Sequence, residues 1–164
     1  MSDLVEKIKS LSSSYFDDIL QFRRHLHSHP ELSFHEHETA KFIEQNLHSF
    51  GITQTERIAD TGITFCLDGK GKGKTIALRA DIDALPILEA NDVPYKSKNE
   101  GVMHACGHDV HTASLLGVAR ILSELKDEFN GTIKFIFQPA EEKSPGGASI
   151  LIKEGDLQNP TPEQ

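Results

Sequence analysis

Residues 132–142 read TIKFIFQPAEE, and this stretch decides the fold because an almost continuous apolar strand runs directly into two carboxylates. A strand as apolar as TIKFIF (132–137) is usually covered on both faces, which places it in the interior of a sheet. Ligands of open α/β sheets gather at the carboxyl ends of strands, and Glu141 and Glu142 follow such an end. The stretch therefore predicts both a buried strand and a polar site beside it.

The rest of the chain alternates between helical and extended patterns. Apolar residues recur at helical spacing in three segments, which are predicted helices: 3–27, 38–50 and 110–125. Two further segments are predicted strands, joined by a glycine-rich hairpin connection: ITFCL (63–67) and TIALRA (75–80). Gly51 suits the C′ position of the second helix, residues 81–108 are predicted to be mostly loop, and a short helix is expected near Gly147. This alternation predicts an α/β sandwich built as a single domain over residues 1–164.

Length and composition narrow the class of protein. The chain has 164 residues, of which 37% are hydrophobic and 26% charged, as expected for a soluble globular domain. Its net charge of −8 argues against nucleic acid as a partner, because phosphate binding needs a basic face. No apolar run approaches a membrane span, and the first ten residues lack the apolar core of a secretory signal. We therefore expect a cytoplasmic protein, with Cys66 and Cys106 reduced.

The first group of candidate ligands is a run of histidines near the N-terminus: His25, His27, His29, His35 and His37. His25 and His29 would share a helix face four residues apart, a spacing that can hold a metal ion. Alternatively, these side chains are ordinary residues of a helix end, where the helix dipole favours histidine. The second interpretation is the one we favour.

The second group lies in HACGHD (104–109), at the start of the third predicted helix. Cys106 and His108 flank a glycine, and a thiolate and an imidazole this close suit a borderline-soft divalent ion. A structural cysteine beside solvent-facing histidines would give the same pattern. Another hypothesis makes Cys106 a nucleophile, with His104 or His111 as its base.

Carboxylates at two strand ends strengthen the metal hypothesis. Consecutive side chains point in different directions, so one of Glu141 and Glu142 can bind metal while the other accepts a proton from water. Asp81 and Asp83 follow the strand TIALRA and are expected to face one side, beside Arg79. Solvated acids and an Arg–Asp ion pair would explain each set alone, but several such sets at strand and helix ends are less easily explained by coincidence.

Four stretches together resemble the metal-dependent aminoacylase/carboxypeptidase amidohydrolases, in the branch of hippurate hydrolase, N-acetyl-diaminopimelate deacetylase and the auxin-conjugate hydrolases. They cover most of the chain in the expected order: FRRHLHSHPELSFHEHETAKFI (22–43), RADIDALP (79–86), MHACGHDVHTASLLG (103–117) and FQPAEE (137–142). The resemblance implies a zinc-peptidase-like α/β catalytic domain interrupted by a smaller lid or dimerisation domain.

The resemblance also implies roles for individual residues. Three positions match metal ligands of the family: Cys106, His108 and Glu142. Glu141 matches the general base, and Asp81 and Asp83 match an acidic pair of which one supports a metal-binding residue. Asp83 resembles that supporting carboxylate, although the sequence alone does not decide between the two. Asp109 is a further candidate for orienting a ligand, whereas the histidines at 25–37 match no family ligand.

The activity implied is hydrolysis of the amide bond of N-acyl amino acids. The resemblance implies two divalent ions (Zn, Mn, Ni or Co) that activate a water molecule, with Glu141 moving its proton to the departing amine. The expected partner is thus a small-molecule substrate, with neither nucleic acid nor membrane, and a homo-oligomer would be compatible with a longer parent.

The chain departs from the family in length. Family members take further histidine ligands from downstream, but no histidine follows His111 here. We therefore expect an N-terminal, truncated part of the catalytic domain, without the lid or dimerisation domain. The alternative function is a catalytically inactive fragment that acts at most as a metal-binding or interaction module.

Overall fold

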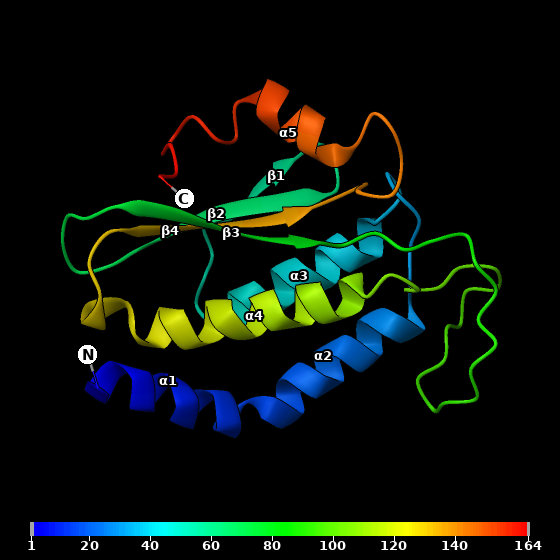
Figure 1. Cartoon of the computed structure of the whole chain (residues 1–164), viewed down its shortest axis with the longest axis horizontal. Coiled ribbons are helices and arrows are strands. Elements are labelled where there is room, and N and C mark those ends of the chain that lie inside the picture. Colours follow the sequence, from blue (N-terminus) through cyan, green and yellow to red (C-terminus); the bar gives the residue numbers. More distant parts are fainter. Residues whose placement is uncertain (1, 164) are drawn as a thin grey trace.

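The computed structural model describes residues 2–163, in which helices cover both faces of one sheet (Figure 1). The helices are α1 (Ser2–Ser14), α2 (Phe16–Ser28), α3 (His37–Ser49), α4 (His108–Glu124), the 3₁₀ turn η1 (Lys126–Glu128) and α5 (Gly147–Glu154). The strands are β1 (Glu56–Ile58), β2 (Gly62–Asp68), β3 (Thr75–Asp81) and β4 (Thr132–Gln138). α3 and α4 pack on one face of the sheet, α1 and α2 lie outside α4, and α5 covers the other face. The predicted α/β sandwich is confirmed.

The sheet has the order β1-β2-β4-β3 within the described residues, so the predicted hairpin between β2 and β3 is wrong. β4 lies between them, antiparallel to β2 and parallel to β3. Six of its seven residues are buried, so this strand suits a place between two neighbours better than an edge. The glycine-rich connection instead contacts the turn before β4, where Gly69 donates a backbone hydrogen bond to Gly131.

The first predicted helix, over 3–27, is in fact two helices that meet at Tyr15. The hydroxyls of Ser13 and Ser14 donate hydrogen bonds to carbonyls four residues earlier, a pattern that bends helices. Tyr15 then turns toward α4, where its hydroxyl bonds to Glu124 and the Arg120 guanidinium lies 3.6 Å from its ring centroid. Local serine hydrogen bonds and this tertiary contact interrupt a pattern that is continuous in sequence.

The other predicted elements lie close to their expected positions. α3, α4, β4 and α5 are confirmed, and Gly51 has the left-handed φ of +82° expected after a helix. Residues 82–107 contain no regular helix or strand, as expected, and only isolated bridges such as Leu85–Met103. β1, three residues long, was not predicted. Within residues 2–163 no helix has both the length and the apolar composition that a membrane crossing requires.

The main core fills the space between the sheet and the helices on the side of α3 and α4. Phe65 and Phe135 stack there with ring centroids 4.7 Å apart, above the buried side chains of Ile43 and Leu116. Helix α2 approaches α4 closely at Gly117, where a Cβ atom would lie 2.5 Å from Cδ1 of Ile19. This packing fixes the start of α4 relative to the sheet, and the candidate site lies at that start.

Candidate metal centre

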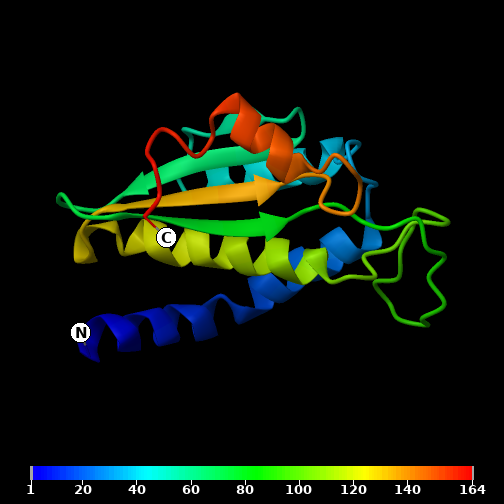
Figure 2. The same ribbon diagram turned by 45° about the horizontal axis from the view of Figure 1, so that its top comes forward.

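The carboxyl ends of β3 and β4 lie side by side because the two strands are parallel (Figure 2). Asp81 is paired with Gln138 in the register, and the backbone N–H of Ile82 donates a hydrogen bond to the Gln138 carbonyl at 3.0 Å. The chain leaves both strands at the same edge of the sheet. Residues 81–83 and 139–142 are therefore brought together.

The first turn of α4 is fixed to the same edge. Gly107 precedes it with φ +112°, a left-handed conformation that favours glycine, and turns the chain between Cys106 and His108. The hydroxyl of Thr112 donates to the Asp81 carbonyl at 2.9 Å, and Nδ1 of His108 lies 2.9 Å from the Asp83 carbonyl. Both contacts place α4 against the end of β3.

Three predicted donors meet at this junction. One ligand atom each from Cys106, His108 and Glu142 lies within 4.8 Å of the other two. Nε2 of His108 lies 3.9 Å from Glu142 and 4.0 Å from Glu141, so both glutamates approach the same imidazole. His108 is buried, whereas the side chains of Glu142 and Glu141 are 22% and 43% exposed. The structure thus joins a thiol, an imidazole and a carboxylate from distant parts of the sequence.

Asp83 contacts two members of this cluster, His108 and Glu142. Its carboxylate accepts hydrogen bonds from the Ser33 hydroxyl at 2.6 Å and from the backbone N–H of Glu142 at 3.0 Å. The other carboxylate oxygen lies 3.2 Å from Nδ1 of His108. Because a carbonyl oxygen only accepts, the contact between Nδ1 and the Asp83 carbonyl requires a hydrogen on Nδ1. Nε2 is then the nitrogen of His108 that faces Glu141 and Glu142.

The charges around the cluster shift the pKa values of its members. Burial opposes the charged forms of Asp83 and His108, but their mutual contact outweighs it. Together with hydrogen bonds from Ser33 and Glu142, it lowers the pKa of Asp83 to about 2 and raises the pKa of His108 to about 9. Desolvation, and then the hydrogen bond and negative charge of Glu142, raise the pKa of the Cys106 thiol. The carboxylate of Asp83 and the protonated form of His108 therefore stabilise each other, while the Cys106 thiol holds its proton.

This donor set fits a divalent metal ion. Thiolate, imidazole and carboxylate are the donors of zinc and related ions, which bind them at about 2.0–2.3 Å. Oδ1 of Asp83 is buried and lies 3.2 Å from Nδ1 of His108, so this carboxylate holds the imidazole in place. A dication among these groups would offset both the desolvation and the negative charge of Glu142 that raise the pKa of the Cys106 thiol. The residues at the site therefore suit the metal that the sequence predicts.

Asp81, the other member of the predicted acidic pair, has different partners. Its carboxylate accepts a hydrogen bond from the Arg79 guanidinium and lies 3.8 Å from Nδ1 of His111. Asp81 does not contact Nδ1 of His108, whereas Asp83 does. Asp109, a candidate for orienting a ligand, instead contacts His27 and Arg23. Of these three carboxylates, Asp83 is the one in direct contact with a donor of the cluster.

Glu36 is fully buried and supports the segment that leads to Glu141, a role that was not predicted from the sequence. Its carboxylate accepts a hydrogen bond from the Thr61 hydroxyl at 2.6 Å and from the backbone N–H of Ala140 at 2.9 Å. Ala140 has a φ of +49°, which is unfavourable for a residue with a side chain. Glu36 therefore holds the bend immediately before Glu141 and Glu142. The only sequence signal was its position just before the second predicted helix.

A second missed feature is the role of His27. This histidine is buried, with Nδ1 2.7 Å from Asp109 and Nε2 3.0 Å from Glu89. It links α2 to the loop 82–107 and to the first turn of α4. His25 and His29 stack with ring centroids 4.5 Å apart, but in the described chain no third His, Cys, Asp or Glu donor joins them. This arrangement agrees with a structural interpretation of the N-terminal histidines.

The geometry disfavours a nucleophilic Cys106 activated by His104. Both ring nitrogens of His104 are buried without a hydrogen-bond partner among residues 2–163, so this imidazole does not bond to the thiol. The raised pKa of Cys106 is also the opposite of what an activated thiolate requires.

Known proteins share this fold and sequence. Residues 77–164 match the sequence model of the family described as Peptidase family M20/M25/M40. The chain is 51% identical over 150 residues to an N-acyl-L-amino acid amidohydrolase of Geobacillus stearothermophilus, and 50% identical over 139 residues to an N-acetyl-L-cysteine deacetylase of Bacillus subtilis. These alignments cover 92% and 85% of this chain, but 40% and 33% of the two relatives. The chain thus spans about two fifths or less of the length of these curated relatives.

A solved structure of a Bacillus subtilis protein, described as a dinuclear metal-binding peptidase of family M20, superposes with a TM-score of 0.83 at 45% identity. The match covers 88% of this chain and 41% of that one. A putative aminohydrolase from methicillin-resistant Staphylococcus aureus gives a TM-score of 0.87 at 45% identity, covering 93% and 39% of the two chains.

Proposed function

Because the chain belongs to peptidase family M20/M25/M40, we propose that it provides the Cys106–His108–Glu142 donor set of a metal-dependent hydrolase of N-acyl amino acids. Substrate class and reaction are suggested by the similar proteins, one described as an N-acyl-L-amino acid amidohydrolase and another as an N-acetyl-L-cysteine deacetylase. The metals proposed are divalent ions of the Zn, Mn, Ni and Co group; of these, Zn suits a thiolate best, whereas Mn prefers carboxylate donors.

One observation carries the proposal. Donor atoms of Cys106, His108 and Glu142 lie within 4.8 Å of one another although they come from a loop, a helix start and the segment after a strand. Asp83 keeps the hydrogen of His108 on Nδ1, which leaves Nε2 free to bind metal. A cysteine with a purely structural role would not need an imidazole and a carboxylate beside its thiol.

A bound divalent ion would supply Lewis-acid chemistry, polarising the amide carbonyl and making water more acidic. In this proposal Glu141 accepts the proton of the attacking water and delivers it to the departing amine. Its greater exposure and its 4.0 Å distance from Nε2 of His108 fit a side chain that moves a proton beside the ligands. Glu36 and Asp83 hold the backbone on either side of Glu141, at Ala140 and Glu142, and so position it.

The two glutamates allow a sharp test. Glu141→Gln is expected to leave the metal content of the purified chain unchanged and to abolish any hydrolysis of N-acetyl or N-benzoyl amino acids. Glu142→Gln is expected to reduce metal content as Cys106→Ala does. Hydrolysis by Glu141→Gln at the rate of the unmodified chain would show that the roles of the two glutamates are wrongly divided.

A second candidate function follows from the partial coverage of the relatives. With three donors in the Cys106 set and only about 40% of the length of the first relative, the chain can be a metal-binding module without turnover. One tightly held ion per chain with no hydrolysis of either substrate would support this alternative. Measurable hydrolysis that disappears on chelation would instead support the hydrolase.

A further inference from the structure

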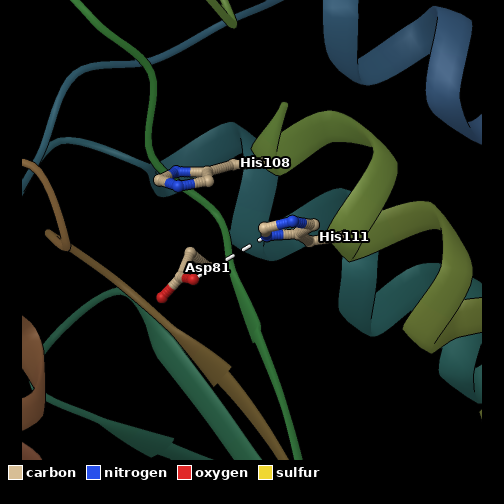
Figure 3. Close-up of side chains that lie close together, drawn as sticks. All are labelled: Asp81, His108 and His111. Carbon is tan, nitrogen blue, oxygen red and sulfur yellow. Dashed lines mark ion pairs between the residues drawn. The ribbon is translucent and has the colours of Figure 1, made fainter. Parts of the chain in front are cut away.

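A second group of potential ligands also includes His108. Asp81 at the end of β3 and His111, one turn further along α4, approach the His108 imidazole (Figure 3). One ligand atom of each of these three residues lies within 4.8 Å of the other two. Asp81 lies 3.8 Å from Nδ1 of His111, and the two imidazole centroids are 5.5 Å apart. The proposed function uses neither Asp81 nor His111.

The backbone holds this second group in place from two directions. The Thr112 hydroxyl bonds to the carbonyl of Asp81 and joins the strand end to the helix turn that carries both histidines. Arg79 bonds to one carboxylate oxygen of Asp81, while the other oxygen is directed to His111. Asp81 is largely buried, whereas the His111 side chain is 52% exposed and can adjust its rotamer. Asp81 is therefore held in place, whereas the side chain of His111 can adjust to a ligand.

His108 belongs to both groups but can serve only one ion at a time. Its Nδ1 carries a hydrogen and contacts Asp83, so Nε2 is the only nitrogen that can release its proton and give a lone pair to a metal ion. If Nε2 binds an ion held by Cys106 and Glu142, the Asp81–His111 group loses its second imidazole. The converse also holds, so occupation of one position weakens the other.

We propose that Asp81, His108 and His111 form an alternative metal position that competes with Cys106 and Glu142 for the His108 imidazole. The two positions differ in donor chemistry. The first contains a thiolate, which selects thiophilic ions, whereas the second has one carboxylate and two imidazoles, a set that suits Mn²⁺ and Fe²⁺. The identity of the ion then decides which of the two groups holds it.

The competition can be measured on the 164-residue chain with Cd²⁺ and Mn²⁺ as probes. Mn²⁺ binding, followed by the electron paramagnetic resonance signal of the free ion, is expected to weaken at least tenfold in His111→Ala and in Asp81→Asn. Cys106→Ala should leave Mn²⁺ affinity within about twofold. Cd²⁺ should show the opposite dependence, with a sulfur-to-metal absorption band that is lost in Cys106→Ala and retained in His111→Ala.

The decisive step adds one equivalent of Cd²⁺ to chain already loaded with Mn²⁺. Because Nε2 of His108 serves one ion, Cd²⁺ is expected to release Mn²⁺. Simultaneous binding of both ions, or Mn²⁺ affinity that is unchanged in His111→Ala, would overturn the proposal. His48→Ala, at an exposed histidine of α3, is the matched control and should change neither affinity. Far-ultraviolet circular dichroism checks that each variant folds.

The inference shares His108 with the proposed function, yet the two can fail separately. Loss of the Cd²⁺ dependence on Cys106 would contradict the donor set of the proposed hydrolase. The dependence of Mn²⁺ on His111 decides the alternative position in either case, because it is measured without turnover.

Discussion

Asp83 contacts the same nitrogen of His108 twice, with its carbonyl oxygen 2.9 Å from Nδ1 and a carboxylate oxygen 3.2 Å away. One residue thus fixes both the ring orientation and the tautomer of the histidine. The same carboxylate also accepts the backbone N–H of Glu142, so a ligand from α4 and a ligand from the end of β4 depend on one acid.

Asp83→Asn is expected to weaken metal binding about 10- to 100-fold, a usual range for loss of a partner that orients a ligand. The amide keeps the shape of the side chain but removes the charge that holds His108. Titration of the chelator-treated chain with Zn²⁺ against a chromophoric competitor measures the change. Asp127→Asn, at an exposed position of η1, is the control. Equal affinities for the two variants would show that Asp83 does not orient the ligand.

Glu36→Ala is expected to destabilise the fold by about 2–6 kcal/mol, since it leaves two buried donors, from Thr61 and Ala140, without an acceptor at about 1–3 kcal/mol each. Glu36→Gln should cost less, because its amide can still accept from the Ala140 N–H and donate to the Thr61 hydroxyl oxygen. Urea unfolding gives both values. An exposed neighbour on α3, Glu38, supplies the control Glu38→Ala, and the idea fails if that variant is destabilised as much as Glu36→Ala.

His27→Ala is expected to destabilise the fold by about 1–3 kcal/mol, because the buried carboxylates of Asp109 and Glu89 lose their shared partner, although Asp109 keeps Arg23 and Glu89 keeps the Ser97 N–H. Thermal unfolding measures the loss, and limited proteolysis should show faster cleavage within the loop 82–107, which Glu89 ties to α2. His35→Ala, at an exposed position, should be nearly neutral. A neutral His27→Ala would mean that the two carboxylates find other partners.

Gly117→Val is expected to destabilise the fold by about 1–3 kcal/mol, since the added side chain would enter the space of Ile19 between α2 and α4. The loss should be smaller when it is measured in an Ile19→Ala background, where that space is open. A double-mutant cycle from urea unfolding gives the coupling between the two positions. Additive effects would indicate that the helices separate rather than clash.

The sequence predicted the elements better than their pairing. The helical spacing of apolar residues in α3 and α4 and the apolar run of β4 are properties of the local sequence. Each of these elements was therefore predicted. The order of the strands is not local. A glycine-rich link between two strands has the composition of a hairpin, and only the need of β4 for two neighbours separates β2 from β3.

Candidate ligands were easier to predict than the residues behind them. Cys106, His108 and the pair Glu141–Glu142 belong to residue types that bind metal and lie at element ends, whereas the choice of Glu142 as the ligand came from the family resemblance. Glu36 and His27 have no such signal, because a buried acid and a buried histidine look like surface residues until their partners are known. The split of Asp81 and Asp83 between His111 and His108 likewise depends on the angle between β3 and α4.

The place of β4 between two earlier strands has a consequence for biosynthesis. β2 and β3 leave the ribosome first, yet neither can make its hydrogen bonds to β4 until residues 132–138 have emerged as well. Until then, the edges of both strands lack their partner, and an emerging chain with such open edges is prone to mispairing. A chaperone that binds nascent chains would cover the open strand edges during this interval. A translational pause before β4 emerges would lengthen it.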